Sequence, residues 1–189
     1  MKKIMGIVVT IILLSINAFA LGAKDVQSFT LTDINGKAYN VKELPNGLDF
    51  EKIKDKIILL EFFGHRCPPC KKSIPHYISL QEKFKKDIAI VAVEVQGLDR
   101  KELASFSKKK GINYITIAQE DTGAFLDHIS QRANWRGSIP FLIILNEKGA
   151  VQTMQTGMVP EDALSRVITG LIETKAKNNN SSKDLNSTK

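Results

Sequence analysis

Ile57-Ile58-Leu59-Leu60-Glu61-Phe62-Phe63-Gly64-His65-Arg66-Cys67-Pro68-Pro69-Cys70 joins an apolar run that contains a single acid to a Cys-Pro-Pro-Cys motif. The run at 57–63 is typical of a central strand that is buried on both faces. Cys67 and Cys70 are the only cysteines of the chain. Two cysteines three residues apart, where a strand ends and a helix begins, can form and break a small disulfide ring. The motif therefore predicts thiol–disulfide exchange.

The first residues have the pattern of a secretory signal. Two lysines precede an apolar segment at 4–16 that is too short to span a bilayer comfortably, and Ala18-Phe19-Ala20 fits the small-x-small cleavage pattern. We therefore expect a signal peptide at 1–20 with cleavage after Ala20. No cysteine lies near the cleavage site, which excludes a lipoprotein. The domain is expected to be exported, most simply to a bacterial periplasm, and an uncleaved membrane anchor is the alternative.

Composition and charge fit one globular domain with appendages. The chain has 189 residues, of which 43% are hydrophobic and 25% charged, so an ordinary core is available. Its net charge of +7 falls to +5 without the signal peptide, and no aromatic residues interleave with the lysines. Such lysines are typical of solvated helix faces, so we expect no nucleic-acid binding. The folded unit is expected at 24–176, and the polar segment 177–189 is expected to be disordered.

The remaining pattern predicts an α/β fold with a mixed sheet. An N-terminal hairpin turns at 33–37, and a loop is expected at Pro45-Asn46-Gly47. After Cys70 the apolar spacing is helical, with Pro75 inside the helix. Further strands are expected at 88–95, 114–118, 141–145 and 150–156, and further helices at 99–110, 122–132 and from Pro160 onward. A parallel βαβ unit thus combines with a closing hairpin.

The motif predicts different roles for its two cysteines. A thiolate is the attacking species, and the N-terminus of a helix, where we place Cys67, favours negative charge. His65, Arg66 and Lys71 add positive charge nearby, so we expect the pKa of the Cys67 thiol to be lowered. Cys70, one turn inside the helix, is expected to be shielded and to act as the resolving thiol.

Pro68 and Pro69 lie between the cysteines and affect them in two ways. Both stiffen the first helical turn, and neither supplies a backbone N–H to the Cys67 thiolate. A less stabilised thiolate makes the pair more reducing, so the motif favours a reductase over an oxidant. The ring is also too short to restrict the unfolded chain much, which argues against a purely structural disulfide.

Glu61 is the one acid in the apolar run and lies six residues before Cys67. A buried carboxylate is costly, so it needs a partner or a function. We predict that it points under the disulfide and exchanges a proton with Cys70, because burial raises the pKa of a carboxyl toward the range of a general acid–base. A salt bridge to a lysine such as Lys56, or an outward-pointing side chain, is the alternative.

A second motif, Ser138-Ile139-Pro140-Phe141, places a proline directly before an apolar strand. We predict a cis bond between Ile139 and Pro140, because cis-prolines mark tight functional turns, and an ordinary trans turn is the alternative. If this turn lies beside Cys67, Pro140 removes an N–H that would crowd the sulfur. The Ile139 backbone can then pair with an extended substrate chain.

Together these features resemble the thioredoxin superfamily over most of 24–176. Three spacings carry the resemblance: Glu61 six residues before Cys67, Pro75 five residues after Cys70, and an Ile-Pro pair before a later strand. The N-terminal hairpin is similar to that of the secreted TlpA-like and ResA-like thiol–disulfide reductases. The resemblance implies a thioredoxin-like mixed sheet flanked by helices, with an N-terminal β-hairpin extension.

The resemblance also implies the roles of single residues. Cys67 is expected to be the nucleophile, Cys70 the resolving thiol and Glu61 the buried acid. Pro140 is expected to be the cis-proline. Arg66 stands where the family usually has tryptophan, which changes the expected substrate surface and lowers the expected pKa of the Cys67 thiol further. The residues expected to bind substrate are Arg66, Pro68, Ile139 and Pro140.

We therefore expect an exported dithiol reductase, a monomer without a cofactor, that receives electrons from a membrane thiol–disulfide carrier. Apocytochrome c before haem attachment and misoxidised proteins are the expected protein disulfide substrates. The alternatives are a disulfide oxidant of similar fold, a Cu(I)-binding chaperone and a non-catalytic interaction module. Copper would be held by the two thiolates, which are soft ligands; His65 and His76 are near them in sequence, and Met154 and Met158 lie on a distant segment. A structural zinc site is not expected, because two cysteines do not supply four ligands.

Overall fold

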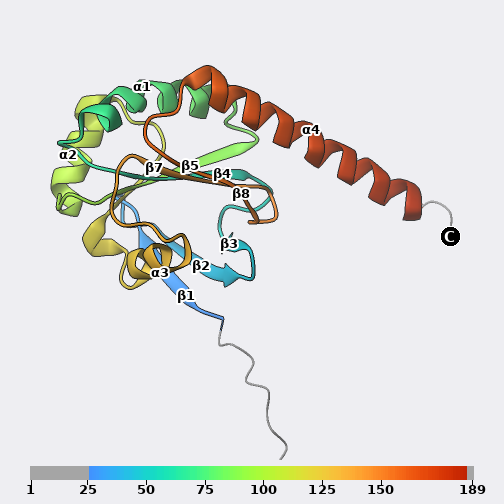
Figure 1. Cartoon of the computed structure of the whole chain (residues 1–189), viewed down its shortest axis with the longest axis horizontal. Helices are drawn as coiled ribbons and strands as arrows, with labels where there is room; N and C mark the ends of the chain where they lie inside the picture. The colour runs from blue at the N-terminus through green and yellow to red at the C-terminus, as the bar shows by residue number, and fades with distance from the viewer. Residues whose placement is uncertain (1–25, 187–189) are drawn as a thin grey trace, which may run out of the picture.

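The computed structural model describes residues 26–186 and contains two β-sheets flanked by helices (Figure 1). The first sheet is antiparallel with the strand order β1-β2-β3, and the second is mixed with the order β6-β5-β4-β7-β8. The strands are β1 (Ser28–Thr32), β2 (Ala38–Leu44), β3 (Gly47–Phe50), β4 (Ile57–Phe63), β5 (Ile88–Glu94), β6 (Ile115–Ala118), β7 (Phe141–Leu145) and β8 (Val151–Thr156). The helices are α1 (Pro68–Lys83), α2 (Arg100–Lys110), α3 (Phe125–Arg132) and α4 (Glu161–Asn186), and a short 3-10 helix, η1, lies at Gln119–Asp121. The expected signal peptide lies outside the described residues.

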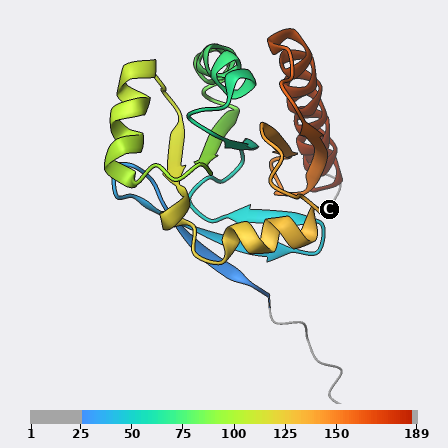
Figure 2. The same ribbon diagram turned by 60° about the vertical axis from the view of Figure 1, so that its left-hand side comes forward.

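Strand β4 lies in the middle of the mixed sheet, and all seven of its residues are buried. It runs parallel to β5 and antiparallel to β7. Successive side chains of a strand point to opposite faces. Ile57 and Leu59 accordingly pack with α1 and α4, whereas Ile58 and Leu60 pack with the first sheet and α3. Figure 2 shows the resulting layers, with α1, α2 and α4 on one side of the mixed sheet and α3 with the first sheet on the other.

The parallel strands β4 and β5 end at the same edge of the mixed sheet, and the helices that follow them begin there. Cys67 is the N-cap residue of α1, and Pro68 occupies a first-turn position where the missing N–H costs nothing. Pro75 lies inside α1, as predicted. Helix α2 begins with a reciprocal capping box between Asp99 and Glu102. This edge of the sheet therefore carries the Cys-Pro-Pro-Cys motif.

Two segments differ from the elements that the sequence predicts. The expected loop at Pro45-Asn46-Gly47 is a tight turn into β3, which pairs with β2 and buries Leu48 and Phe50. The N-terminal hairpin is therefore part of a three-stranded sheet. The helix expected at 122–132 is shorter, because Gly123 adopts a positive φ of 52° that interrupts the helical backbone ahead of α3.

The segment that was expected to be disordered from Lys177 continues α4 as far as Asn186 in the structure. Each residue added to an existing helix gains a hydrogen bond without a new nucleation step. Leu164 and Ile168 anchor α4 in the core, so the helix can extend from there into a polar segment. Residues 187–189 lie outside the described part of the chain. Within residues 26–186, no helix has the length and apolar character needed to cross a membrane.

Candidate active site

The two cysteines form a disulfide at the start of α1. Their S–S bond is 2.11 Å long, and their Cα atoms are 5.2 Å apart. Cys67 is the N-cap residue and Cys70 lies in the first turn, so the ring sits at the helix N-terminus, which favours negative charge on sulfur. The Cys70 N–H donates to Cys67 Sγ over 3.2 Å, and it is the only backbone donor to either sulfur within residues 26–186. The prolines between the cysteines have no N–H to add.

Cys67 is the sulfur nearer the surface. Its residue is 6% exposed, against 1% for Cys70. The neighbours Arg66 and Pro68 are exposed on either side of it. The Arg66 main chain is held, since its N–H donates to Gln96 Oε1 over 2.8 Å. This geometry suits Cys67 for attack on a partner disulfide and Cys70 for resolution.

The loop before β7 lies against Cys67. Its Ile139–Pro140 bond is cis, as predicted, and the Ile139 carbonyl oxygen is 3.9 Å from Cys67 Sγ. Ile139 is half-buried and Pro140 is buried. Trp135 supports the loop, because its Nε1–H donates to the Ser138 carbonyl oxygen over 2.7 Å. The structure thus brings the two motifs of the sequence together at one site.

Glu61 lies in the middle of β4 and is 1% exposed. Its Oε1 has no hydrogen-bond partner within the described residues. Burial raises the pKa of this carboxyl well above its usual range, and a hydrogen bond from Tyr77 acts in the opposite direction. The alternative of a salt bridge to Lys56 is wrong, because Lys56 Nζ instead donates to the carbonyl oxygen of Lys85. No hydrogen bond joins Glu61 to Cys70 in the described structure, so proton transfer between them stays a prediction.

Two tyrosines lie within electrostatic reach of Glu61. Tyr77 is on α1 and Tyr114 precedes β6, and their rings meet edge to face with centroids 6.2 Å apart. Burial, followed by the negative charge of Glu61, raises the pKa of both hydroxyls. The apolar helical spacing in the sequence predicts that Tyr77 lies in the core but does not predict the position of its hydroxyl. The hydrogen bond from Tyr77 to Glu61 was therefore missed. The acid therefore has neutral hydroxyls beside it.

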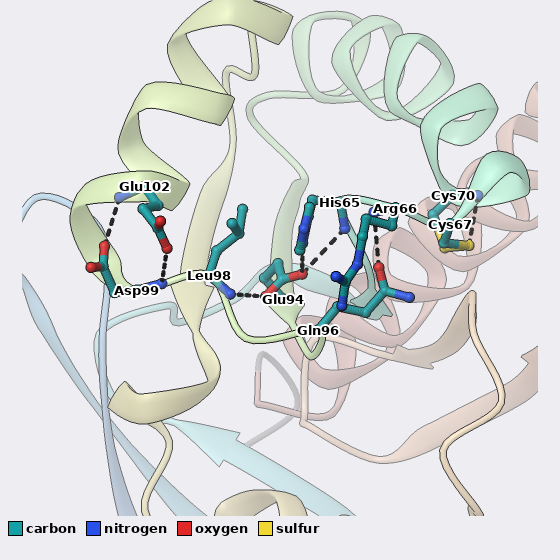
Figure 3. Close-up of polar contacts among 9 residues, drawn as sticks. All are labelled: His65, Arg66, Cys67, Cys70, Glu94, Gln96, Leu98, Asp99 and Glu102. Carbon is teal, nitrogen blue, oxygen red and sulfur yellow. Dashed lines mark hydrogen bonds and ion pairs between the residues drawn. A yellow bond between two sulfur atoms is a disulfide. The ribbon is translucent and has the colours of Figure 1, made fainter.

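Sequence reasoning also missed Glu94, the last residue of β5. Its side chain is fully buried, and Figure 3 shows it between the two loops that follow β4 and β5. It binds the main chain and ring of His65 and the main chain of Leu98. His65 is therefore paired with an acid, where the sequence indicated only added positive charge. A signal was available, because Glu94 is a lone acid in an apolar strand, the pattern that singles out Glu61.

Residues 26–186 contain no group of three or more histidine, cysteine, aspartate or glutamate side chains that could hold a metal ion. Of the further ligands considered for copper, His65 is bound to Glu94 and Met154 lies on the edge strand β8.

Known proteins with a similar sequence or structure include disulfide-exchange enzymes. The AhpC/TSA family matches residues 21–154. The thiol-disulfide oxidoreductase ResA of Bacillus subtilis (strain 168) is 29% identical over 141 residues, which cover 74% of this chain and 70% of ResA. A thioredoxin-family thiol:disulfide interchange protein of Chlorobium tepidum has a TM-score of 0.64 at 19% identity, with 76% of this chain and 92% of that chain covered.

A secreted disulfide oxidoreductase of Mycobacterium tuberculosis has a TM-score of 0.57 at 19% identity, with 75% of this chain and 95% of that chain covered. At such identities the solved structures establish the fold, and that fold is thioredoxin-like. The family match spans well over half of the chain, and it includes both cysteines. The chain therefore belongs to the AhpC/TSA family of the thioredoxin superfamily and is a thiol–disulfide oxidoreductase with the pair Cys67–Cys70.

Proposed function

We propose that the chain is an exported disulfide reductase with Cys67 as its nucleophile. The observation that carries this proposal is the single backbone N–H, that of Cys70, that reaches Cys67 Sγ within the described residues. Pro68 and Pro69 fill the positions from which further donors would come. A sulfur with few donors forms a less stable thiolate, and a pair whose reduced form is less stable gives up its electrons more readily.

The reaction begins from the dithiol form. The Cys67 thiolate attacks one sulfur of the substrate disulfide, so that a bond between Cys67 and the substrate forms and the substrate S–S bond breaks. The other substrate sulfur leaves as a thiolate and takes up a proton. Cys70 then loses its proton and attacks Cys67 Sγ, which restores the Cys67–Cys70 disulfide and releases the second substrate sulfur. Two electrons pass from the pair to the substrate.

Glu61 is the proposed acceptor of the Cys70 proton. Its burial raises the pKa of the carboxyl, and a carboxylate with a raised pKa is a stronger base than an exposed one. The same group returns the proton when the disulfide is reduced again. Its position in the strand that leads to the motif supports this role.

The substrate surface is proposed to comprise Arg66, Pro68, Ile139 and Pro140. Arg66 and Pro68 are exposed next to Cys67, and the Ile139 carbonyl lies beside its sulfur. An extended substrate segment can pair with the main chain of this loop while its disulfide meets Cys67. Recognition through main-chain atoms suits an enzyme that acts on several proteins.

Export and electron supply complete the proposal. The signal-like pattern at 1–20 supports export to the periplasm, and so does the likeness to a relative described as secreted. A membrane thiol–disulfide carrier is proposed to supply two electrons per cycle, which regenerates the dithiol and leaves the carrier oxidised. Apocytochrome c before haem attachment and misoxidised exported proteins are the proposed substrates.

The redox equilibrium of Cys67–Cys70 against glutathione tests the direction of the reaction. A potential near that of thioredoxin, about −270 mV, would support the reductase, and one near about −120 mV would make the chain an oxidant. Insulin reduction by the dithiol form provides the matching activity assay.

Trapping in cells tests the nucleophile and identifies the substrates. In Cys70→Ala the resolving thiol is absent, so Cys67 should accumulate mixed disulfides with its substrates. The double variant Cys67→Ala/Cys70→Ala is the control and should trap nothing. Equal amounts of trapped protein from the two variants would contradict the proposed roles.

A further inference from the structure

A buried carboxylate holds the loop that leads into the disulfide (Figure 3). Glu94 pairs with Phe63 across β5 and β4, and its side chain is 0% exposed. Its Oε1 accepts the His65 N–H over 3.2 Å and lies 2.8 Å from His65 Nδ1, while Oε2 accepts the Leu98 N–H over 3.0 Å. An ionised carboxylate can accept all three bonds, and these bonds offset the cost of its burial. Glu94 thus ties the loop after β4 to the loop after β5.

Gln96 adds a second tie to the same loop. Its Oε1 accepts the Arg66 N–H over 2.8 Å, and its side chain packs closely on Gly64, where a Cβ would lie 2.3 Å from Gln96 Cδ. The Cys67 N–H donates to the Gly64 carbonyl oxygen over 3.1 Å. Three consecutive N–H groups, those of residues 65–67, are therefore held, and side chains from the β5 end hold two of them.

We propose that Glu94 is a positioning residue for disulfide exchange, which acts through His65 to keep Cys67 in place when the disulfide is open. The inference rests on the proposed role of Cys67 as the attacking sulfur. Once the S–S bond is reduced, the ring no longer restrains the two sulfurs, whereas the ties from Glu94 and Gln96 to the main chain persist. A Cys67 that stays in place remains close to Cys70, which favours closure of the ring.

Replacing the Glu94 carboxylate has two effects that act in the same direction. A looser loop lowers the tendency of the two thiols to close the ring. The loss of a buried negative charge beside the loop stabilises the Cys67 thiolate and hence the reduced form. Both effects make the disulfide easier to reduce. We expect Glu94→Gln, whose amide can accept at only one of its two heteroatoms, to shift the equilibrium about tenfold toward the dithiol, which is about 30 mV for a two-electron couple.

The experiment equilibrates the purified chain with dithiothreitol redox buffers and measures the dithiol fraction by alkylation. His65→Ala removes the ring that binds Glu94 but leaves the carboxylate and its charge, so it should shift the equilibrium in the same direction by a smaller factor. His65→Asn keeps an N–H donor close to the position of Nδ1 and should stay near wild type. Glu102→Gln is the matched control, because glutamine serves equally well in the α2 capping box and this glutamate is exposed.

A purely structural role would lower the melting temperature of Glu94→Gln and His65→Ala without moving the equilibrium constant, and that result would overturn the proposal. If Glu94→Gln does not fold, Gln96→Ala tests the same loop, because it removes the hydrogen bond from the Arg66 N–H to Gln96. An unchanged equilibrium constant in both Gln96→Ala and His65→Ala would then overturn the proposal. These measurements use no protein substrate. A failure of the reductase proposal would appear as absent insulin reduction by the wild-type dithiol, so the two outcomes are distinguishable.

Discussion

Two buried carboxylates, those of Glu61 and Glu94, lie on neighbouring strands of the mixed sheet and differ in their hydrogen-bond partners. Glu61, in the middle of β4, has an oxygen without a partner within the described residues, and burial raises the pKa of its carboxyl. Glu94, at the end of β5, accepts two backbone N–H groups and also contacts the ring of His65. Both are almost completely shielded from solvent, at 1% and 0% exposure. Burial alone therefore does not decide what an acid does in this protein.

The difference follows from the position of each residue in its strand. In mid-sheet, the backbone N–H groups around Glu61 are used by the ladders to β5 and β7, so few donors remain for a side chain. At the carboxyl end of a strand, the loop N–H groups have no ladder partner and can bind a carboxylate. The first position raises the pKa of a carboxyl and makes its carboxylate a stronger base, and the second position lets a carboxylate hold a loop.

The largest expected effect is on stability. Glu94→Ala leaves two loop N–H groups without their acceptor, so we expect the free energy of unfolding to fall by about 3 kcal/mol. Glu61→Leu removes a poorly partnered polar group and should leave that free energy unchanged or raise it by about 1 kcal/mol. Urea denaturation near neutral pH measures both. Similar losses in the two variants would break the distinction between the carboxylates.

In catalysis, by contrast, Glu61 should matter more than Glu94, because the resolving step requires a proton acceptor. Glu61→Gln cannot take a proton from Cys70, so we expect the rate at which Cys70 resolves a mixed disulfide to fall about 100-fold. The first attack by Cys67 should stay close to wild type. Stopped-flow measurement of both steps with a small disulfide provides the test, with Glu102→Gln as the control. A normal resolution rate in Glu61→Gln would remove Glu61 from the mechanism.

The pH dependence of stability should carry the signature of Glu61. Because its pKa is higher in the folded than in the unfolded state, the folded protein keeps a proton that the unfolded chain releases above its ordinary value of 4.5. The contribution of the protonated Glu61 to the free energy of unfolding is complete below pH 4.5. It is lost as the pH rises from there to the folded-state pKa, by at most about 1.4 kcal/mol per pH unit. Urea unfolding of wild type and Glu61→Gln between about pH 4 and 8 checks this. Parallel curves for the two proteins would contradict it.

The smallest expected effect concerns Tyr77. Its hydrogen bond lowers the pKa of Glu61, so Tyr77→Phe should raise that pKa further and extend the fall in stability to higher pH. The direct cost of the lost bond should be about 1 kcal/mol. Tyr114→Phe, which removes no hydrogen bond to Glu61, is the matched control. The same urea titration measures both variants, and an identical response in the two would rule out a specific contact from Tyr77.

Most of the disulfide site could be predicted because its chemistry lies in short motifs. The spacing of Cys67 and Cys70, the lone acid six residues earlier and the Ile139-Pro140 pair are all local patterns. The structure confirms the disulfide, the burial of Glu61 and the cis bond, and it places the Ile139 carbonyl beside Cys67. The catalytic and substrate-binding roles of these residues remain predictions.

The parts that were missed depend on residues far apart in the chain. β3 has only four residues, and its pairing with β2 follows from a turn that reads equally well as a loop. Glu94 stands out in the sequence as a lone acid in an apolar strand, but its partner His65 lies 29 positions away, and only the pairing of β4 with β5 brings the two together. The continuation of α4 past Lys177 depends on a helix that is anchored elsewhere by packing.

By itself the sequence determined the central strand, the reactive pair, the proline turn and the order of the strands and helices other than β3. Periodicity and spacing encode these features locally, since side-chain direction repeats with the strand or helix period. Only the tertiary structure decided which buried acid finds donors. A buried carboxylate finds donors only where backbone N–H groups are not already used in the strand ladders. Which N–H groups these are depends on how strands from distant parts of the sequence pair in the folded protein.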